Sequence, residues 1–212
     1  LMNKELLLEC FTRLKGKAAS GIDNVTKDKY AVNLSANLDN LVERLHKMAY
    51  RPQPVLRIYI PKPGSTKQRP LGITALEDKL VQSALVKIME RIYEEDFIAD
   101  SYGFRPKRSC HDALRALSQT VESGYIHHMV EADIKGFFDN VDQEQLMRFL
   151  GHRIADKRIL RLIRRFLKAG IQEDGKYKAS ENGTPQGGVH FIKFAPLLVS
   201  QHLPSLYARP LV

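Results

Sequence analysis

The chain has 212 residues, 43% hydrophobic and 27% charged, a composition typical of globular proteins and unlike that of disordered or fibrous ones. The 33 Lys and Arg residues outnumber the 24 Asp and Glu residues, and the net charge of +9 favours a polyanionic partner such as nucleic acid. Two cysteines provide neither a disulfide framework nor a metal-ligand spacing, and no apolar run suggests a membrane-spanning helix or a signal peptide, so we expect a cytoplasmic protein without a membrane partner.

Apolar side chains recur at steps of three and four in three segments of the first half, which is the spacing of one helix face. The predicted helices cover residues 3–15, 28–48 and 76–93. The small and polar residues 16–26 predict a loop after the first helix. Residues 55–60 are typical of a strand, and a Pro-rich turn and a returning strand over 67–72 follow.

The second half continues the mixture of helices and short strands. After an irregular basic segment, Ser109 and Asp112 form a capping-box pattern that opens a helix. The other predicted elements are a strand over 126–133, a helix over 142–150, a helix over 156–169 and a hairpin turn over 173–176. Because few strands are mixed among many helices, the pattern indicates an α+β fold rather than a repeated strand–helix–strand array.

Asp133 lies at the end of one expected strand, in the run Glu131-Ala-Asp-Ile-Lys-Gly-Phe-Phe-Asp-Asn140. A carboxylate fixed by a sheet suits phosphoryl transfer by two divalent metals, because Mg²⁺ takes hard oxygen ligands and usually only one or two carboxylates. Taken alone, an Asp at a strand end is more often a turn former or a helix cap. Whether Asp133 is a metal ligand therefore depends on the other motifs that occur in the chain.

A second motif, Gly183-Thr-Pro-Gln-Gly-Gly188, follows later in the chain. Glycine allows close approach of backbone to a ligand, and the Gln186 amide can donate to and accept from a sugar or a base. Together the two motifs resemble those of group II intron-type reverse transcriptases, also called intron-encoded maturases. The resemblance covers residues 1 to about 189. It implies a right-hand polymerase fold with fingers and a partial palm, mainly helical with a small antiparallel sheet.

The resemblance implies roles for residues of both motifs. The residue matching Asp133 is catalytic and binds both metals, and the backbone carbonyl at Ile134 helps to hold one of them. The ring matching Phe138 lies under the sugar of the incoming nucleotide, where it clashes with a 2′-hydroxyl and so selects deoxynucleotides. Gln186 matches a residue beside nucleotide and primer. The implied cofactor is two Mg²⁺ ions, and the implied partners are dNTPs, a DNA primer or target, and an RNA template that we expect to be intron RNA.

Basic residues flank the turn of the predicted hairpin. Lys62 and Arg69 could neutralise an incoming triphosphate, since Arg binds phosphate oxygens with two donors and Lys acts as a point charge. A solvated basic hairpin is the alternative. The resemblance implies that both positions contact the nucleotide phosphates.

Two further segments are candidates for template contacts. Residues 101–109 interleave cations with aromatic rings, which suits a nucleic-acid backbone with stacked bases, although the Gly-Phe-Arg-Pro core could instead lock fingers against palm. Residues 19–26 resemble the family's N-terminal extension, which contacts template RNA. The candidate template-binding residues are Asn24, Arg105, Lys107 and Arg108.

The resemblance ends just after the glycine motif. In the family, a helix-forming run and an aromatic-x-Asp-Asp hairpin with the remaining metal-binding carboxylates follow, and no such motif occurs here. Pro204 and Pro210 disfavour a helix in the tail. A frameshift after Val189 is one hypothesis; an artificial chain end and a divergent family member are alternatives. Since Asp133 is the only evident catalytic carboxylate, we expect a truncated enzyme with little or no activity alone.

We expect an N-terminal extension (1–27), fingers (28–125), the first part of the palm (126–150), fingers and palm helices with a hairpin (151–182), the start of a second palm segment (183–189) and an aberrant tail (190–212). The leading interpretation is an RNA-directed DNA polymerase, a nucleotidyltransferase. The alternatives are a non-catalytic RNA-binding fragment that assists intron RNA and a decayed product without function. An intron maturase, a retron enzyme and a CRISPR-associated relative all remain open.

Overall fold

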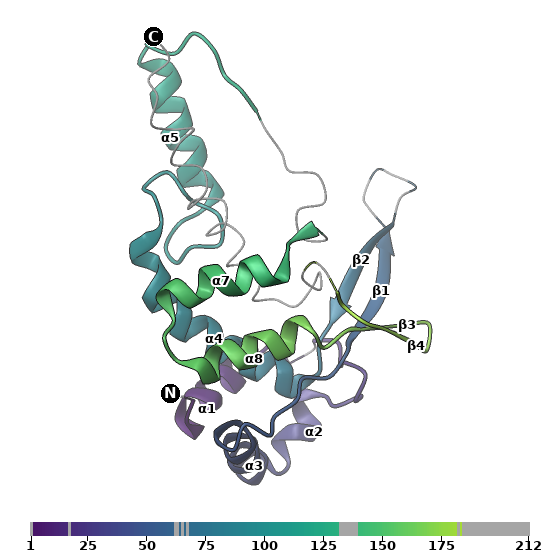
Figure 1. The fold of residues 1–212 in the computed structure, drawn as a ribbon. Helices are drawn as coiled ribbons and strands as arrows, with labels where there is room; N and C mark the ends of the chain where they lie inside the picture. Colours follow the sequence, from purple (N-terminus) through teal and green to yellow (C-terminus); the bar gives the residue numbers. More distant parts are fainter. Residues whose placement is uncertain are drawn as a thin grey trace.

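The computed structural model describes residues 2–16, 18–61, 64, 66, 68–131, 140–181 and 183 (Figure 1). The helices are α1 (Lys4–Arg13), α2 (Lys27–Ala31), α3 (Leu34–His46), α4 (Leu76–Tyr93), α5 (Cys110–Glu122), α7 (Gln143–Arg153) and α8 (Lys157–Leu167), with a 3-10 turn, η1 (Glu94–Asp96). The strands are β1 (Val55–Pro61), β2 (Gln68–Ile73), β3 (Ile171–Glu173) and β4 (Lys176–Lys178). The α+β class predicted from the sequence is confirmed.

Two helices, α2 and α3, stand where the periodicity predicts one helix over residues 28–48. The backbone leaves the helical path at Asn33, with φ −120° and ψ 38°. The Asn37 side-chain amide donates to the Tyr30 carbonyl at 3.0 Å, so it supplies a donor that the interrupted helix no longer provides. Tyr30 and Leu38 are both buried, as the stripe predicts. The prediction of one unbroken helix is therefore wrong, and the predicted buried face is correct.

Helix α4 is the centre of the hydrophobic core. Ten of its 18 residues are buried, so apolar side chains cover more than one of its sides. Leu80, Val81 and Ala84 are fully buried, in the same cluster as Leu7 of α1 and Leu41 of α3. Each fully buried leucine contributes roughly 2 kcal/mol to the stability of the fold. Packing against α4 therefore holds the neighbouring helices α1 and α3 in place. Within the described ranges, no helix combines the length and apolarity that a membrane span requires.

Aspartates begin α7 and α8. Asp142 accepts the backbone N–H groups of Glu144 and Gln145 at 2.8 and 2.9 Å, which satisfies two of the free donors at the start of α7. Asp156 accepts the backbone N–H of Arg158 at 2.8 Å at the start of α8. The two helices then lie side by side (Figure 1), and their apolar faces join the core.

A four-stranded sheet in the order β2-β1-β3-β4 lies beside the helices (Figure 1). Strands β1 and β2 form the predicted antiparallel hairpin, with Ile60 opposite Arg69. Strand β1 also pairs in parallel with β3, with Val55 opposite Ile171, so the sheet is mixed and the expectation of an antiparallel sheet is wrong. The chain segment from β2 through α8 supplies the long crossover that parallel neighbours require. The pairing begins where the Val55 N–H donates to the Gly170 carbonyl at 3.0 Å.

Helix α5 extends away from the core and buries none of its residues (Figure 1). Its predicted capping box is present: the Ser109 N–H donates to the Asp112 carboxylate at 2.9 Å, and the Asp112 N–H donates to the Ser109 hydroxyl at 3.3 Å. The strand predicted over 126–133 is not formed in its described part, 126–131, which is irregular and exposed. A lone strand is unstable, and the described residues offer this segment no neighbouring strand.

Candidate nucleotide and nucleic-acid site

The described ends of the two sequence motifs meet at Gly183. The Gly183 backbone N–H donates to the Val141 carbonyl at 2.9 Å. The Gln143 Nε2 group donates to the Gly183 carbonyl at 2.9 Å and to the Leu167 carbonyl at 3.3 Å. Val141 directly follows the motif that contains Asp133, and Gly183 opens the glycine motif. These hydrogen bonds therefore hold the flanks of both motifs together, although they lie far apart in sequence.

Gln143 was not singled out from the sequence, yet its side chain joins three segments. It is 4% exposed, and its Oε1 atom is buried without a hydrogen-bond partner among the described residues. A signal for this role exists, because Gln143 lies at steps of three and four from the buried residues Leu146, Met147 and Leu150. A polar residue in an apolar stripe indicates a buried hydrogen-bonding position.

Five predicted nucleotide-site residues lie outside the residues that the structure describes: Lys62, Asp133, Ile134, Phe138 and Gln186. The tail over residues 190–212 lies outside them as well. In the described part, no three His, Cys, Asp or Glu side chains gather as a group that could hold a metal ion. The structure therefore gives the backbone that flanks these residues: the hairpin strands around Lys62 and the hydrogen-bonded segments beside Asp133 and Gln186.

Arg69 extends from β2 near the tip of the hairpin, where it is exposed. Side chains alternate across a strand, so Arg69 shares one face of the hairpin with Ile58 and Leu71, which are themselves paired and partly exposed. A guanidinium beside an apolar strip combines a phosphate-binding group with a surface for a base or sugar. The geometry is compatible with the nucleotide contact that the resemblance implies.

A cluster of Tyr59, Glu173 and Lys178 fastens this hairpin to the β3–β4 hairpin. The Tyr59 hydroxyl and the Lys178 ammonium both donate to the Glu173 carboxylate. The Lys178 contact lowers the pKa of Glu173, with a further contribution from Tyr59. The same hydrogen bond raises the pKa of Tyr59. The cluster links β1 to β4, which ends shortly before Gly183, so it connects the β1–β2 hairpin with the segment that leads to Gly183.

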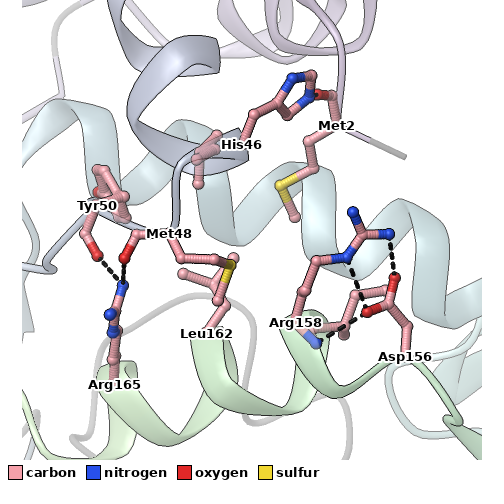
Figure 2. Close-up of a pocket in the computed structure, with 10 residues that line it drawn as sticks. Met2, His46, Met48, Tyr50, Asp156, Arg158, Leu162 and Arg165 are labelled. Atoms are coloured by element: carbon pink, nitrogen blue, oxygen red, sulfur yellow. Dashed lines mark hydrogen bonds and ion pairs between the residues drawn. The ribbon is translucent and has the colours of Figure 1, made fainter.

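A buried network lies beneath the start of β1. The Asp78 carboxylate accepts the Tyr50 hydroxyl and the Gln53 backbone N–H, the latter at 3.0 Å. Asp78 is 2% exposed, and burial raises its pKa to about 6. Burial and the nearby Asp78 charge also raise the pKa of Tyr50. On the other side, Arg165 of α8 donates to the carbonyls of Met48 and Tyr50 at 2.7 and 2.6 Å (Figure 2).

These contacts border a cavity of about 330 Å³ between α3 and α8. Figure 2 shows Met2, Met48 and Leu162 beside it, with the Asp156–Arg158 ion pair on one side. Its lining is largely apolar, and His46 is held by a contact of 2.9 Å between its Nε2 atom and the Met2 carbonyl. The network therefore acts as the base from which β1 and the hairpin extend.

The loop with Asn24 is anchored against the start of α4. A side chain at Gly21 would meet the Ala75 backbone nitrogen at 2.5 Å, so only glycine allows this close approach. The Lys79 ammonium donates to the Ala19 carbonyl at 2.6 Å. Asn24 itself is exposed, with a left-handed backbone at φ 52°. The loop thus presents Asn24 to solvent from a fixed base, and template binding by Asn24 remains a prediction.

The three candidate cations of residues 101–109 differ in their surroundings. The Arg105 side chain is 6% exposed, contacts Glu94 at 2.7 Å and lies over the Phe97 ring. It also donates to the Ile98 and Ser101 carbonyls, so this geometry favours a local structural role over a template contact. All of these partners lie within residues 94–101, so a lock between fingers and palm stays a prediction. Arg108 donates to the Ala99 carbonyl at 2.6 Å. Lys107 is exposed, and the described residues give it no ion-pair partner, so its ammonium is available to a template.

Residues 60–208 match the family model described as "Reverse transcriptase (RNA-dependent DNA polymerase)". The chain belongs to this family. The matched range contains Asp133, the whole glycine motif and most of the tail over 190–212, so it runs beyond residue 189, where we expected the resemblance to end.

This reverse transcriptase is similar to a group II intron-encoded protein and to other relatives. It is 42% identical over 192 residues to the group II intron-encoded protein LtrA of Lactococcus lactis subsp. cremoris, covering 91% of this chain and 31% of LtrA. It is 40% identical over 187 residues to protein YkfC of Escherichia coli K12, covering 87% and 48%. An uncharacterized 91 kDa protein in a cob intron of Schizosaccharomyces pombe is 34% identical over 209 residues, covering 97% and 25%. The chain therefore spans between a quarter and a half of these relatives.

The fold of this reverse transcriptase is also similar to a solved structure entitled "Partial Cas6-RT-Cas1--Cas2 complex". The TM-score is 0.52 at 20% sequence identity, and the match covers 96% of this chain and 33% of that one. At this identity the likeness concerns the fold alone.

Proposed function

We propose that the chain forms the fingers and the first part of the palm of an RNA-directed DNA polymerase that adds dNTPs to a DNA primer on an RNA template, with intron RNA as the template. The observation that carries this proposal is the junction of Val141, Gln143 and Gly183, which joins the flanks of the two motifs. The Tyr59–Glu173–Lys178 cluster supports it, since it connects the hairpin that bears Arg69 to the same region.

Each candidate residue then has a distinct task. Asp133 and the Ile134 carbonyl would hold Mg²⁺, which in such a site activates the attacking hydroxyl and neutralises the triphosphate. Lys62 and Arg69 would bind the triphosphate oxygens and orient them. Phe138 would exclude a 2′-hydroxyl by its bulk, and Gln186 would contact nucleotide and primer. The described residues support this arrangement through the backbone frame and not through a metal site of their own.

The 212 residues contain no adjacent Asp pair, so Asp133 would be without the other carboxylates of a two-metal site. We therefore propose that this segment alone polymerises little or not at all. The second candidate function, RNA binding without catalysis, is favoured by one observation: exposed cations such as Lys107 do not depend on the metal site.

A chimaera tests the proposal. Residues 1–189 replace the segment of LtrA that they match, and primer extension is measured with Mg²⁺, an RNA template, a DNA primer and dNTPs. We expect incorporation by the chimaera, loss of at least a thousandfold in Asp133→Asn because charge neutralisation dominates this chemistry, and no loss in the matched control Asp174→Asn in an exposed turn. A chimaera that binds RNA but does not incorporate dNTPs, or keeps full activity in Asp133→Asn, would contradict it.

A further inference from the structure

We propose that the outer surface of α7 and α8 is a binding site for double-stranded RNA, separate from the nucleotide site. It rests on the proposed function only in taking nucleic acid as the partner of this chain. The surface is defined by the groove between the two helices, with a volume of about 340 Å³. Its lining residues are Glu144, Met147, Arg148, Lys157, Leu160, Arg161 and Arg164.

Charge is concentrated in this part of the chain. Residues 143–168 contain eight Lys and Arg residues against two acids, a net charge of +6 out of the chain's +9. The remaining residues are close to neutral by comparison. A basic patch of this density on one pair of helices is the electrostatic footprint of a polyanion.

The cations of α8 form one stripe. Lys157, Arg161, Arg164 and Lys168 follow at steps of four, three and four, so they lie on the same side of the helix. All four are exposed. The opposite side is buried through Ile159, Leu162, Ile163, Phe166 and Leu167. With a rise of 1.5 Å per residue the stripe is about 16 Å long, enough to follow several phosphates along a duplex.

Few of these charges are neutralised within the protein. Arg164 forms a two-pronged contact with Glu144 of α7, at 2.7 and 3.2 Å. In the part of the chain that the structure describes, no ion pair neutralises Arg148, Lys157 or Arg161. Burial and then the Arg161 charge lower the pKa of Arg165, so like charges one helical turn apart on α8 disfavour each other's charged form. A phosphate backbone would relieve this repulsion.

The lining also favours a duplex over a single strand. Single-stranded nucleic acid is usually held by aromatic rings on which bases stack, and no Phe, Tyr or Trp is among the described residues that line the groove. Double-stranded RNA is recognised by its shape and by contacts with its phosphates and sugars, which cations in a shallow groove can supply. The surface starts near Gln143, which holds Gly183, so a duplex bound there would lie near Gly183.

The test compares the 212-residue chain with the variant Lys157→Gln/Arg161→Gln in binding a 20-base-pair RNA duplex by fluorescence anisotropy across a KCl series. We expect about tenfold weaker binding near 100 mM KCl and a slope of log K against log [KCl] that is shallower by about two, since each lost phosphate contact removes about one. The matched control Arg91→Gln/Arg115→Gln carries the same charge change on exposed residues of α4 and α5. It should bind like the unchanged chain.

Equal losses in the control, an unchanged slope, or a loss seen only with single-stranded RNA would overturn the proposal. Tighter binding of a DNA duplex of the same sequence would assign the surface to DNA and overturn it too. Circular dichroism checks that each variant folds. No dNTP is present, so a protein that cannot polymerise still reports on this surface, and failure here is distinct from failure of the proposed function.

Discussion

Tyr50 and Asp78 form a pair beneath β1, and Tyr59 and Glu173 form a chemically similar pair on the face of the sheet. In the first pair burial raises the pKa of Asp78 to about 6. In the second, Lys178 lowers the pKa of Glu173 although Glu173 itself is only 7% exposed, because both of its partners are charged or polar groups that reach solvent. The same tyrosine hydrogen bond thus accompanies opposite shifts, because burial dominates one site and a neighbouring cation the other.

The largest expected difference between the two pairs is in stability. Asp78→Ala leaves the Tyr50 hydroxyl and the Gln53 N–H without an acceptor in the core, and we expect the free energy of unfolding to fall by about 4 kcal/mol. Glu173→Ala should cause a clearly smaller loss, since its partners Tyr59 and Lys178 are exposed and water can take the place of the carboxylate. Urea unfolding followed by circular dichroism measures both. Equal losses would mean that the exposure of the hydrogen-bond partners does not separate the pairs.

The two carboxylates should also respond to pH with opposite signs. The folded pKa of Asp78 lies above its ordinary value of 3.8, so its contribution to stability is present below pH 4 and is lost as the pH rises through about 6. The loss is about 3 kcal/mol for a shift of this size. Glu173 has a lowered pKa, so its contribution is present above pH 4.5 and is lost as the pH falls further.

Unfolding experiments between pH 3 and 7 check these signs. Asp78→Asn keeps a side chain of the same shape without the titrating group, so it should remove the decrease in stability between pH 4 and 6. The exposed Asp39→Asn is the matched control and should leave the profile unchanged. If the free energy of unfolding of Asp78→Asn falls with pH as steeply as that of the unchanged protein, a group other than Asp78 titrates between pH 4 and 6.

A smaller difference in the free energy of unfolding is expected between variants of Tyr50 and Tyr59. Tyr50→Phe removes the donor from a buried carboxylate and should lower the free energy of unfolding by about 2 kcal/mol. Tyr59→Phe should have little effect, because its ring is 48% exposed and Lys178 still contacts Glu173. Thermal unfolding of both single variants makes the comparison directly, and a greater loss in Tyr59→Phe would reverse it.

The smallest expected effect concerns the position of the β1–β2 hairpin, measured through KM for dNTP. Glu173→Gln weakens the cluster that fastens β1 to β4, so in the chimaera we expect KM for dNTP to rise about threefold, with kcat nearly unchanged. Lys176→Gln, an exposed change on the same hairpin, serves as the control. A change in kcat alone would point to a role other than hairpin placement.

Local patterns in the sequence account for most of the helices. The apolar period predicts α1 and α4, and Ser109 with Asp112 predicts the start of α5, because these signals act within a few residues. The parallel pairing of Val55 with Ile171 depends on segments brought together by the tertiary fold. No local sequence pattern predicts the pairing of segments that lie far apart in the chain.

The candidate site shows the same division between local sequence patterns and contacts made by the tertiary fold. The motifs around Asp133 and Gly183 carry the proposed chemistry, and Arg69 lies on the predicted hairpin. Gln143 escaped notice because its partners, Leu167 and Gly183, lie 24 and 40 residues away. Arg105 has the residue type of a template contact, yet Glu94 and Phe97 engage it. Residue type suggests a role, and the three-dimensional neighbours decide whether the group is available.

The central claim is that the two motifs form one metal-dependent nucleotide site, and Fe²⁺-directed cleavage tests it most directly. Fe²⁺ replaces Mg²⁺ in the chimaera with template, primer and dNTP bound, and the hydroxyl radicals that it generates cut the nearby backbone. We predict cuts both near Asp133 and within residues 183–188, and loss of both sets in Asp133→Asn. Cuts confined to one motif, or unchanged in Asp133→Asn, would contradict the account.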